Sequence, residues 1–193
     1  VAESPRRTIV PASWRPADVL AAIAAAQRRV HDANLIDEDL DGVGEYAGLA
    51  EICAQGGGRM ERVLAQPFLD RRLGDLNDFG QAQHDDYLYA IYLPGLAGRG
   101  MGELKRGYGA GQLEINLAEG FWCAYAWPLH PGAGPAYFIG QDGVLLAAAD
   151  AGYAGVENAP QPGAALDAGG LAGILGRPAK GRAQDGHQWL PAR

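Results

Sequence analysis

The sequence predicts an α+β fold in which an N-terminal helix packs on a four-stranded antiparallel meander, with extended arms at both ends. Three observations lead to this prediction. An apolar stripe with helical spacing lies near the N-terminus, four short β-type runs occupy the second half, and Pro- and Gly-rich segments form the two ends. Helices that precede a series of strands are typical of the α+β class. We expect an arm over residues 1–13, a domain over residues 14–158 and a C-terminal tail over residues 159–193.

The N-terminal helix is expected over residues 14–33. Pro16 suits a first turn, and Asp18 lies where the helix dipole favours a negative charge. The apolar residues that recur at helical spacing are Val19, Leu20, Ile23, Ala26 and Val30. A shorter helix is expected over residues 46–54, where the glycines at positions 56–58 end it, and a further helical piece over residues 59–66.

The four strands are expected over residues 87–93, 121–127, 136–140 and 144–148. Gln141, Asp142 and Gly143 predict a tight turn between the last two strands. Short runs joined by turns favour an antiparallel meander. Residues 95–112 are Gly-rich and predict a long surface loop.

Composition narrows the classes of function. The net charge of −7 argues against a nucleic-acid binder, and no apolar run approaches the roughly 18 residues of a membrane-spanning helix. Ser4, Thr8 and Ser13 are the only hydroxyl residues of Ser or Thr type. The chain therefore lacks the serine motifs of hydrolases and the phosphate loop of nucleotide-binding proteins, and we predict that it is not an enzyme.

The strongest local motif is an acidic loop over residues 37–45, with the D-x-D-x-D-G pattern of calcium loops. Alternate carboxylates on a tight turn converge on one point, and Ca²⁺ takes six to eight hard oxygen ligands. The predicted ligands are Asp37, Asp39, Asp41, the Val43 carbonyl and Glu45. A complete EF-hand has Glu at loop position twelve, where this chain has Gly48.

An acidic loop that merely caps a helix is the alternative to a Ca²⁺ site. Seven acidic residues and no basic one lie between Asp32 and Glu51. Such crowding is unfavourable unless a cation neutralises it, which favours the calcium interpretation.

Cys53 and Cys123 leave two alternatives open. An even, low number of cysteines fits one disulfide in an oxidising compartment, and it fits two buried thiols equally well. The chain begins at Val1, as an exported protein does after its signal peptide is removed, and a trimmed sequence would begin in the same way.

The N-terminal arm combines charge with a β-competent run. Arg6 and Arg7 precede Thr8, Ile9 and Val10, and prolines flank the run. An arm of this kind could add to the open sheet edge of a neighbouring subunit, while its arginines meet an acidic surface. This predicts a homo-oligomer or polymer.

Two sets of segments carry a resemblance to known exported proteins. Residues 37–51 resemble a D-x-D-G-x-G-E-Y-x-x-L-A-E segment of pilin-like bacterial proteins, and the helix-then-meander layout resembles the globular head of type IV pilins and type II secretion pseudopilins. Residues 87–95, 120–128 and 137–144 also resemble a bacterial exported domain of unknown function. The resemblance covers about residues 17–150 and implies an extracellular structural subunit. The long apolar N-terminal helix of pilins is missing.

Two functions follow as hypotheses. The first is an extracellular, calcium-stabilised structural subunit that assembles into a filament or other polymer. The alternative is a soluble exported binding module for an envelope, glycan or peptide partner.

Overall fold

The computed structural model describes residues 14–55, 59, 66–105, 107–109, 111–167 and 173–192. The predicted arm, with its assembly residues Arg6, Arg7, Thr8, Ile9 and Val10, lies outside these residues, as does most of the helical piece expected over residues 59–66. In chain order the elements are α1 (Pro16–Asp32), α2 (Leu49–Ile52), η1 (Arg71–Gly74), β1 (Ala82–His84), β2 (Tyr87–Pro94), η2 (Leu96–Gly98), β3 (Gly100–Gly102), α3 (Ile115–Ala118), β4 (Cys123–Pro128), β5 (Ala136–Gly140), β6 (Leu146–Ala148), β7 (Gly181–Arg182) and β8 (Gln188–Pro191).

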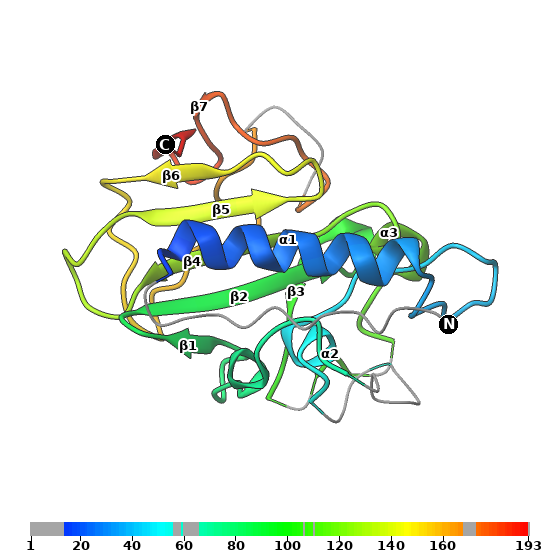
Figure 1. Cartoon of the computed structure of the whole chain (residues 1–193). Helices are drawn as coiled ribbons and strands as arrows, with labels where there is room; N and C mark the ends of the chain where they lie inside the picture. Colours follow the sequence, from blue (N-terminus) through cyan, green and yellow to red (C-terminus); the bar gives the residue numbers. More distant parts are fainter. Residues whose placement is uncertain are drawn as a thin grey trace.

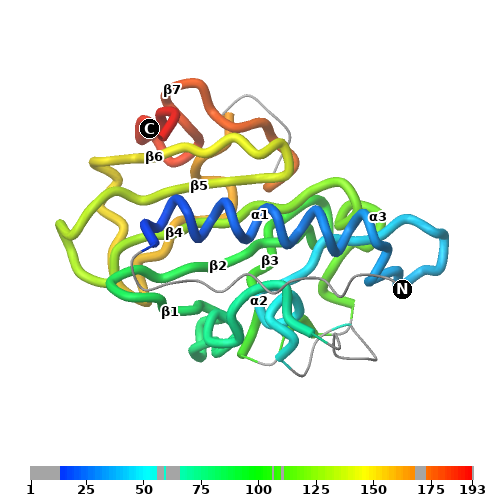
Figure 2. The backbone as a smooth tube through the Cα atoms, in the orientation of Figure 1, coloured from blue at the N-terminus to red at the C-terminus, as the bar shows by residue number. Residues whose placement is uncertain are grey.

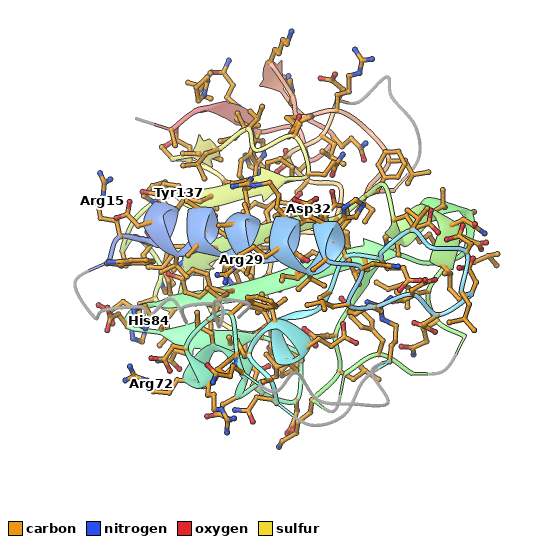
Figure 3. The ribbon with its side chains drawn as sticks, turned by 45° about the vertical axis from the view of Figure 1, so that its right-hand side comes forward. Arg15, Arg29, Asp32, Arg72, His84 and Tyr137 are labelled. Carbon is orange, nitrogen blue, oxygen red and sulfur yellow. The ribbon has the colours of Figure 1, made fainter. Side chains whose placement is uncertain are left out.

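Helix α1 confirms the predicted N-terminal helix within two residues at its start and one at its end. Pro16 occupies the first turn, and Asp18 accepts a hydrogen bond from the Arg15 backbone N–H at 3.2 Å. Figure 3 shows Arg15 and Tyr137 near this end of the helix and Asp32 at the other. The predicted apolar face is buried, because α1 lies along one face of the sheet (Figure 1).

The sheet is antiparallel and wider than the predicted meander. Its eight strands follow the order β1-β2-β4-β5-β6-β8-β7, with β3 also paired to β2. The four predicted strands are β2, β4, β5 and β6, and they form the centre of the sheet in the expected order. Gly143, with φ of 73°, closes the turn between β5 and β6 by donating its N–H to the Gly140 carbonyl at 2.9 Å.

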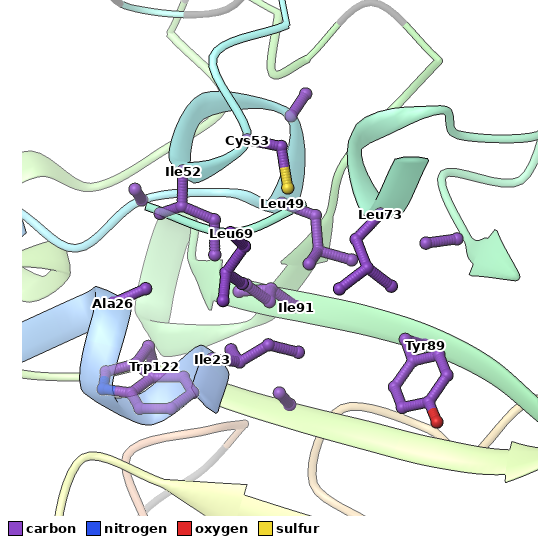
Figure 4. Close-up of a cluster of buried hydrophobic side chains, with 14 of the residues drawn as sticks. Ile23, Ala26, Leu49, Ile52, Cys53, Leu69, Leu73, Tyr89, Ile91 and Trp122 are labelled. Atoms are coloured by element: carbon purple, nitrogen blue, oxygen red, sulfur yellow. The ribbon is translucent and has the colours of Figure 1, made fainter. Parts of the chain in front are cut away.

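Strand alternation separates two cores on the two faces of the sheet. In β4, Ala124 and Ala126 face the helix-side core, whereas Cys123, Tyr125 and Trp127 face the tail-side core. The helix-side core lies between α1, α2 and the sheet, and Figure 4 shows side chains from Ile23, Leu69 and Ile91 meeting there. The small side chains of β4 let α1 approach the sheet closely.

The C-terminal segment expected as an extended tail is instead folded against the sheet. Ala165, Leu166 and Ile174 are buried in the tail-side core, and Trp189 of β8 is fully buried with its indole N–H bonded to Asp185 at 3.0 Å. Figure 2 shows the chain returning to the sheet at β7 and the C-terminus. The prediction failed because Gly, Ala and Pro carry little apolar signal, yet their small side chains pack closely over the aromatic residues of β4 and β5.

The two cysteines are buried thiols that no disulfide joins, so the structure agrees with the second of the two alternatives and not with the predicted Cys53–Cys123 disulfide. Cys53 lies in the helix-side core (Figure 4), and Cys123 points to the tail-side core, where its thiol contacts the Pro162 carbonyl at 3.3 Å. Strand β4 directs the Cys123 side chain to the tail-side face of the sheet, whereas Cys53 packs on the helix-side face, so the sheet separates the two thiols. Burial raises the pKa of the Cys123 thiol, which keeps it protonated and unreactive.

Candidate metal centre

The acidic loop of residues 37–45 connects α1 to the segment before α2, and it lies beside α3 (Figure 1). Asp37 organises the turn by accepting N–H groups from Asp41 at 3.1 Å and Gly42 at 3.2 Å. Asn34 donates its side-chain amide to the same carboxylate at 3.1 Å. Gly42, with φ of 92°, adopts a backbone conformation that a side chain would disfavour.

Glycine also holds the loop against the end of α1. A Cβ atom added at Gly44 would lie 2.6 Å from the His31 carbonyl oxygen and 3.0 Å from the Asn34 Cα. The loop backbone can therefore approach the last turn of the helix only because position 44 has no side chain. This fixes where the carboxylates of the loop are presented.

Two overlapping groups of carboxylates form at this position. Oxygens of Asp37, Asp39 and Glu45 lie within 4.8 Å of one another, and so do oxygens of Asp39, Asp41 and Glu119. All four predicted acidic ligands are thus brought together. Asp39 belongs to both groups and joins them into one cluster of five carboxylates.

Glu119 is the residue that sequence reasoning missed. It follows α3 directly and lies far from the loop in the sequence. The Tyr46 N–H donates to the Ala118 carbonyl at 2.9 Å, and this bond ties the end of α3 to the end of the acidic loop. Glu119 thereby adds a carboxylate that a complete EF-hand supplies from position twelve, where this chain has Gly48.

Two oxygens of the cluster are buried and lack a hydrogen-bond partner among the described residues: Oε2 of Glu45 and Oε1 of Glu119. Glu45 is 0% exposed, and its other oxygen accepts the Glu38 N–H at 2.8 Å. Burial raises the pKa of Glu45. The pKa of Glu119 is raised first by loss of hydration and then by the charges of Asp41, Asp39 and Asp37. Both carboxylates therefore gain stability from a nearby cation.

Arg59 places a buried positive charge next to the loop. The Arg59 side chain is 6% exposed, with Nη1 at 3.3 Å from Glu38 and at 3.9 Å from Oε2 of Glu45, the oxygen that has no hydrogen bond. Its Nη2 contacts Glu51 at 3.1 Å and donates to the Tyr46 carbonyl at 2.6 Å. Arg59 thus faces three carboxylates, and the longest of these contacts is the one to Glu45. Among the described residues, the carboxylates around Arg59 and in the loop outnumber this one positive charge.

Glu103 forms a second buried carboxylate next to this network. It accepts N–H groups from Leu49 and from Ala50, the latter at 3.1 Å. Burial, followed by the charge of Glu51, raises its pKa to about 8. A Cβ atom at Gly48 would lie 2.3 Å from the Glu103 carboxyl carbon, so the glycine gives this side chain its place. Glu51 is engaged here and not in the metal cluster.

The arrangement fits a hard divalent cation. Its donors are carboxylates only, drawn from a tight loop and from one residue outside it. For Val43 the structure gives a backbone N–H donated to Asp41 at 2.8 Å, and the role of its carbonyl stays a prediction.

Comparison of the chain with protein-family models, curated proteins and solved structures finds no match. Of the pilin-like resemblance, the structure confirms an N-terminal helix packed on an antiparallel sheet, which is a fold class and not a family. Within the described residues, no helix has the length and apolar character needed to cross a membrane.

Proposed function

We propose that this protein is an exported, non-catalytic binding module whose fold is stabilised by one Ca²⁺ ion in the acidic loop. The proposed ligands are carboxylates of Asp37, Asp39, Asp41, Glu45 and Glu119, with the Val43 carbonyl. The observation that carries the proposal is the buried Oε1 of Glu119, which has no hydrogen-bond partner among the described residues although the carboxylate of Glu119 groups with those of Asp39 and Asp41. Burying a carboxylate oxygen without a partner costs free energy, and a bound cation would offset that cost.

The chemistry of the donors favours calcium over other divalent metals. Zn²⁺ in proteins favours His and Cys ligands, and neither occurs in the two carboxylate groups. Mg²⁺ requires strict octahedral geometry and retains several waters, whereas Ca²⁺ accepts a flexible set of six to eight oxygens. An incomplete EF-hand-like loop suits the weaker sites of extracellular modules, with dissociation constants on the order of 10⁻⁴ to 10⁻³ M.

The sheet edges bear on the choice between a binding module and a filament subunit. At the outer edges of the four-stranded meander, β2 pairs with β1 and β3, and β6 pairs with β8. Among the described strands, an arm from a neighbour would therefore have the two- and three-residue strands β7, β1 and β3 to extend. Filament assembly through the arm stays a prediction, and deletion of residues 1–12 tests it by light scattering.

The calcium proposal is tested by thermal unfolding in Ca²⁺, in Mg²⁺ and in chelator. A ligand that binds only the folded state stabilises it by about 2.7 kcal/mol at 100 times its dissociation constant. For a chain of this size, that corresponds to a rise of roughly 5–10 °C in the melting temperature. We expect this rise with Ca²⁺ and a much smaller one with Mg²⁺. A melting temperature that does not respond to Ca²⁺ would refute the proposal.

A further inference from the structure

The end of the sheet next to the β5–β6 turn contains a large apolar cavity. This cavity, the hairpin pocket, has a volume of about 870 Å³. It is open to solvent and is lined by the turn itself, by residues 175–180 and by the end of β8. Its apolar walls come from Phe121, Val144, Leu175, Pro178 and Leu190. Val144 is 40% and Leu190 is 53% exposed, so two exposed apolar side chains line the same opening.

The rim of the hairpin pocket is positively charged. Arg177 and Lys180 line it, both are exposed, and neither makes an ion pair or side-chain hydrogen bond with a described residue. Asp142 is the only acidic residue of the lining, and its Oδ1 accepts the Val144 N–H at 3.2 Å. Within the described part of the chain, two cations without an ion-pair partner and one carboxylate that accepts a hydrogen bond give the rim a net positive charge, on a chain whose net charge is −7.

Pockets of roughly 300–1,000 Å³ with apolar walls and a few polar groups are the usual sites for small molecules. The volume and walls of the hairpin pocket fit this class, and the charges at its rim select the sign of the ligand. A basic ligand would be repelled, and so would the N-terminal arm of a second copy, because Arg6 and Arg7 precede its apolar run. The complementary occupant has an apolar body and one anionic group.

We propose that the hairpin pocket binds an amphiphilic carboxylate, with its apolar chain against Val144 and Leu190 and its carboxylate between Arg177 and Lys180. This inference rests on the binding half of the proposed function and names the chemical class of the ligand. It does not depend on the calcium proposal, because none of the proposed metal ligands lines the pocket.

The test is titration calorimetry of the intact chain with decanoate, in chelator and again in Ca²⁺ at a concentration above its dissociation constant. Nonyltrimethylammonium, which has the same nine-carbon apolar chain and a cationic head, is the control ligand. We expect saturable binding of one decanoate per chain and at least about tenfold weaker binding of the ammonium compound. Equal affinity for the two ligands, or no binding of decanoate, would overturn the inference.

Variants distinguish the contribution of the apolar walls to decanoate binding from that of the charged rim. Val144→Trp fills the opening and is expected to abolish binding, whereas Leu96→Trp places the same side chain at a residue that is 79% exposed and outside the pocket lining, and should bind normally. The double variant Arg177→Glu and Lys180→Glu should weaken decanoate binding about tenfold or more. Arg28→Glu with Arg71→Glu makes the same change in net charge away from the pocket and should leave the affinity unchanged.

The outcomes distinguish this proposal from the calcium proposal. Decanoate binding in a protein whose melting temperature ignores Ca²⁺ would leave the pocket assignment intact and remove the metal site. A melting temperature that rises with Ca²⁺ in a protein that does not bind decanoate would keep the metal site and remove the pocket assignment. An oligomer that Val144→Trp dissociates would assign the pocket to a second copy of the chain and overturn the ligand proposal.

Discussion

Replacing Glu119 by Gln should remove most of the stabilisation by Ca²⁺ without damaging the fold. Gln has the same shape, but it takes one negative charge from the group that Glu119 forms with Asp39 and Asp41. The affinity of calcium loops depends strongly on the number of charged ligands. If the dissociation constant rises about 100-fold, a concentration that gave the wild type about 2.7 kcal/mol gives the variant only about 0.4 kcal/mol.

The same substitution should have the opposite effect without calcium. The pKa of Glu119 is raised by loss of hydration and by the three loop aspartates, so its charged form is unfavourable in the folded protein. Removing that charge therefore raises the melting temperature in chelator. The expected result is a smaller difference between the melting temperatures in calcium and in chelator, because the variant melts lower than the wild type in calcium and higher in chelator.

Differential scanning calorimetry in both buffers measures this directly. Glu157→Gln, a neutralised glutamate on an exposed turn outside the carboxylate groups, is the control and should keep the full calcium response. The reasoning fails if Glu119→Gln responds to Ca²⁺ as the wild type does. It also fails if the variant is less stable than the wild type in chelator.

Two further predictions concern the buried network. Burial raises the pKa of Glu103 to about 8 from the 4.5 of an ordinary glutamate, so between these pH values the folded state holds a proton that the unfolded chain has lost. The free energy of unfolding should therefore fall as the pH rises across that window, by at most about 1.4 kcal/mol per pH unit. Glu103→Gln should flatten this slope, which chemical denaturation at several pH values measures. Gly48→Ala should destabilise the protein by about 2–4 kcal/mol, because its Cβ would lie 2.3 Å from the Glu103 carboxyl carbon and displace a carboxylate that accepts two backbone N–H groups. Gly120→Ala is the control, since its Cβ would lie 3.9 Å from the nearest atom. An equal loss of stability in both variants would contradict this role for Gly48.

The central sheet was predictable because its strands carry strong local signals. Aromatic and apolar residues fill β2, β4 and β5, and Gly143 marks the turn after β5. The outer strands carry no such signal. β3 is Gly-Met-Gly and β7 is Gly-Arg, and each forms only because a longer neighbour offers it hydrogen-bonding groups.

The acidic loop was predictable in part for the same kind of reason. Alternating aspartates followed by Gly42 are a local pattern, so Asp37, Asp39 and Asp41 could be identified from spacing alone. Glu119 joins them only through the tertiary contact between α3 and the chain that leaves the loop, and nothing around it in the sequence indicates that contact. Glu103 and Arg59 escaped notice for the same reason, since burial of a charged side chain is decided by packing and not by local sequence.

The central claim is that one cation lies among the carboxylates of the acidic loop and Glu119. Anomalous diffraction from crystals grown with Ca²⁺ locates such an ion without assumptions about stability. The account predicts one peak at roughly 2.3–2.6 Å from oxygens of Asp39 and Glu119, in contact with at least two further loop oxygens. An empty loop in saturating Ca²⁺, or an ion bound elsewhere while Glu119 faces solvent, would contradict it.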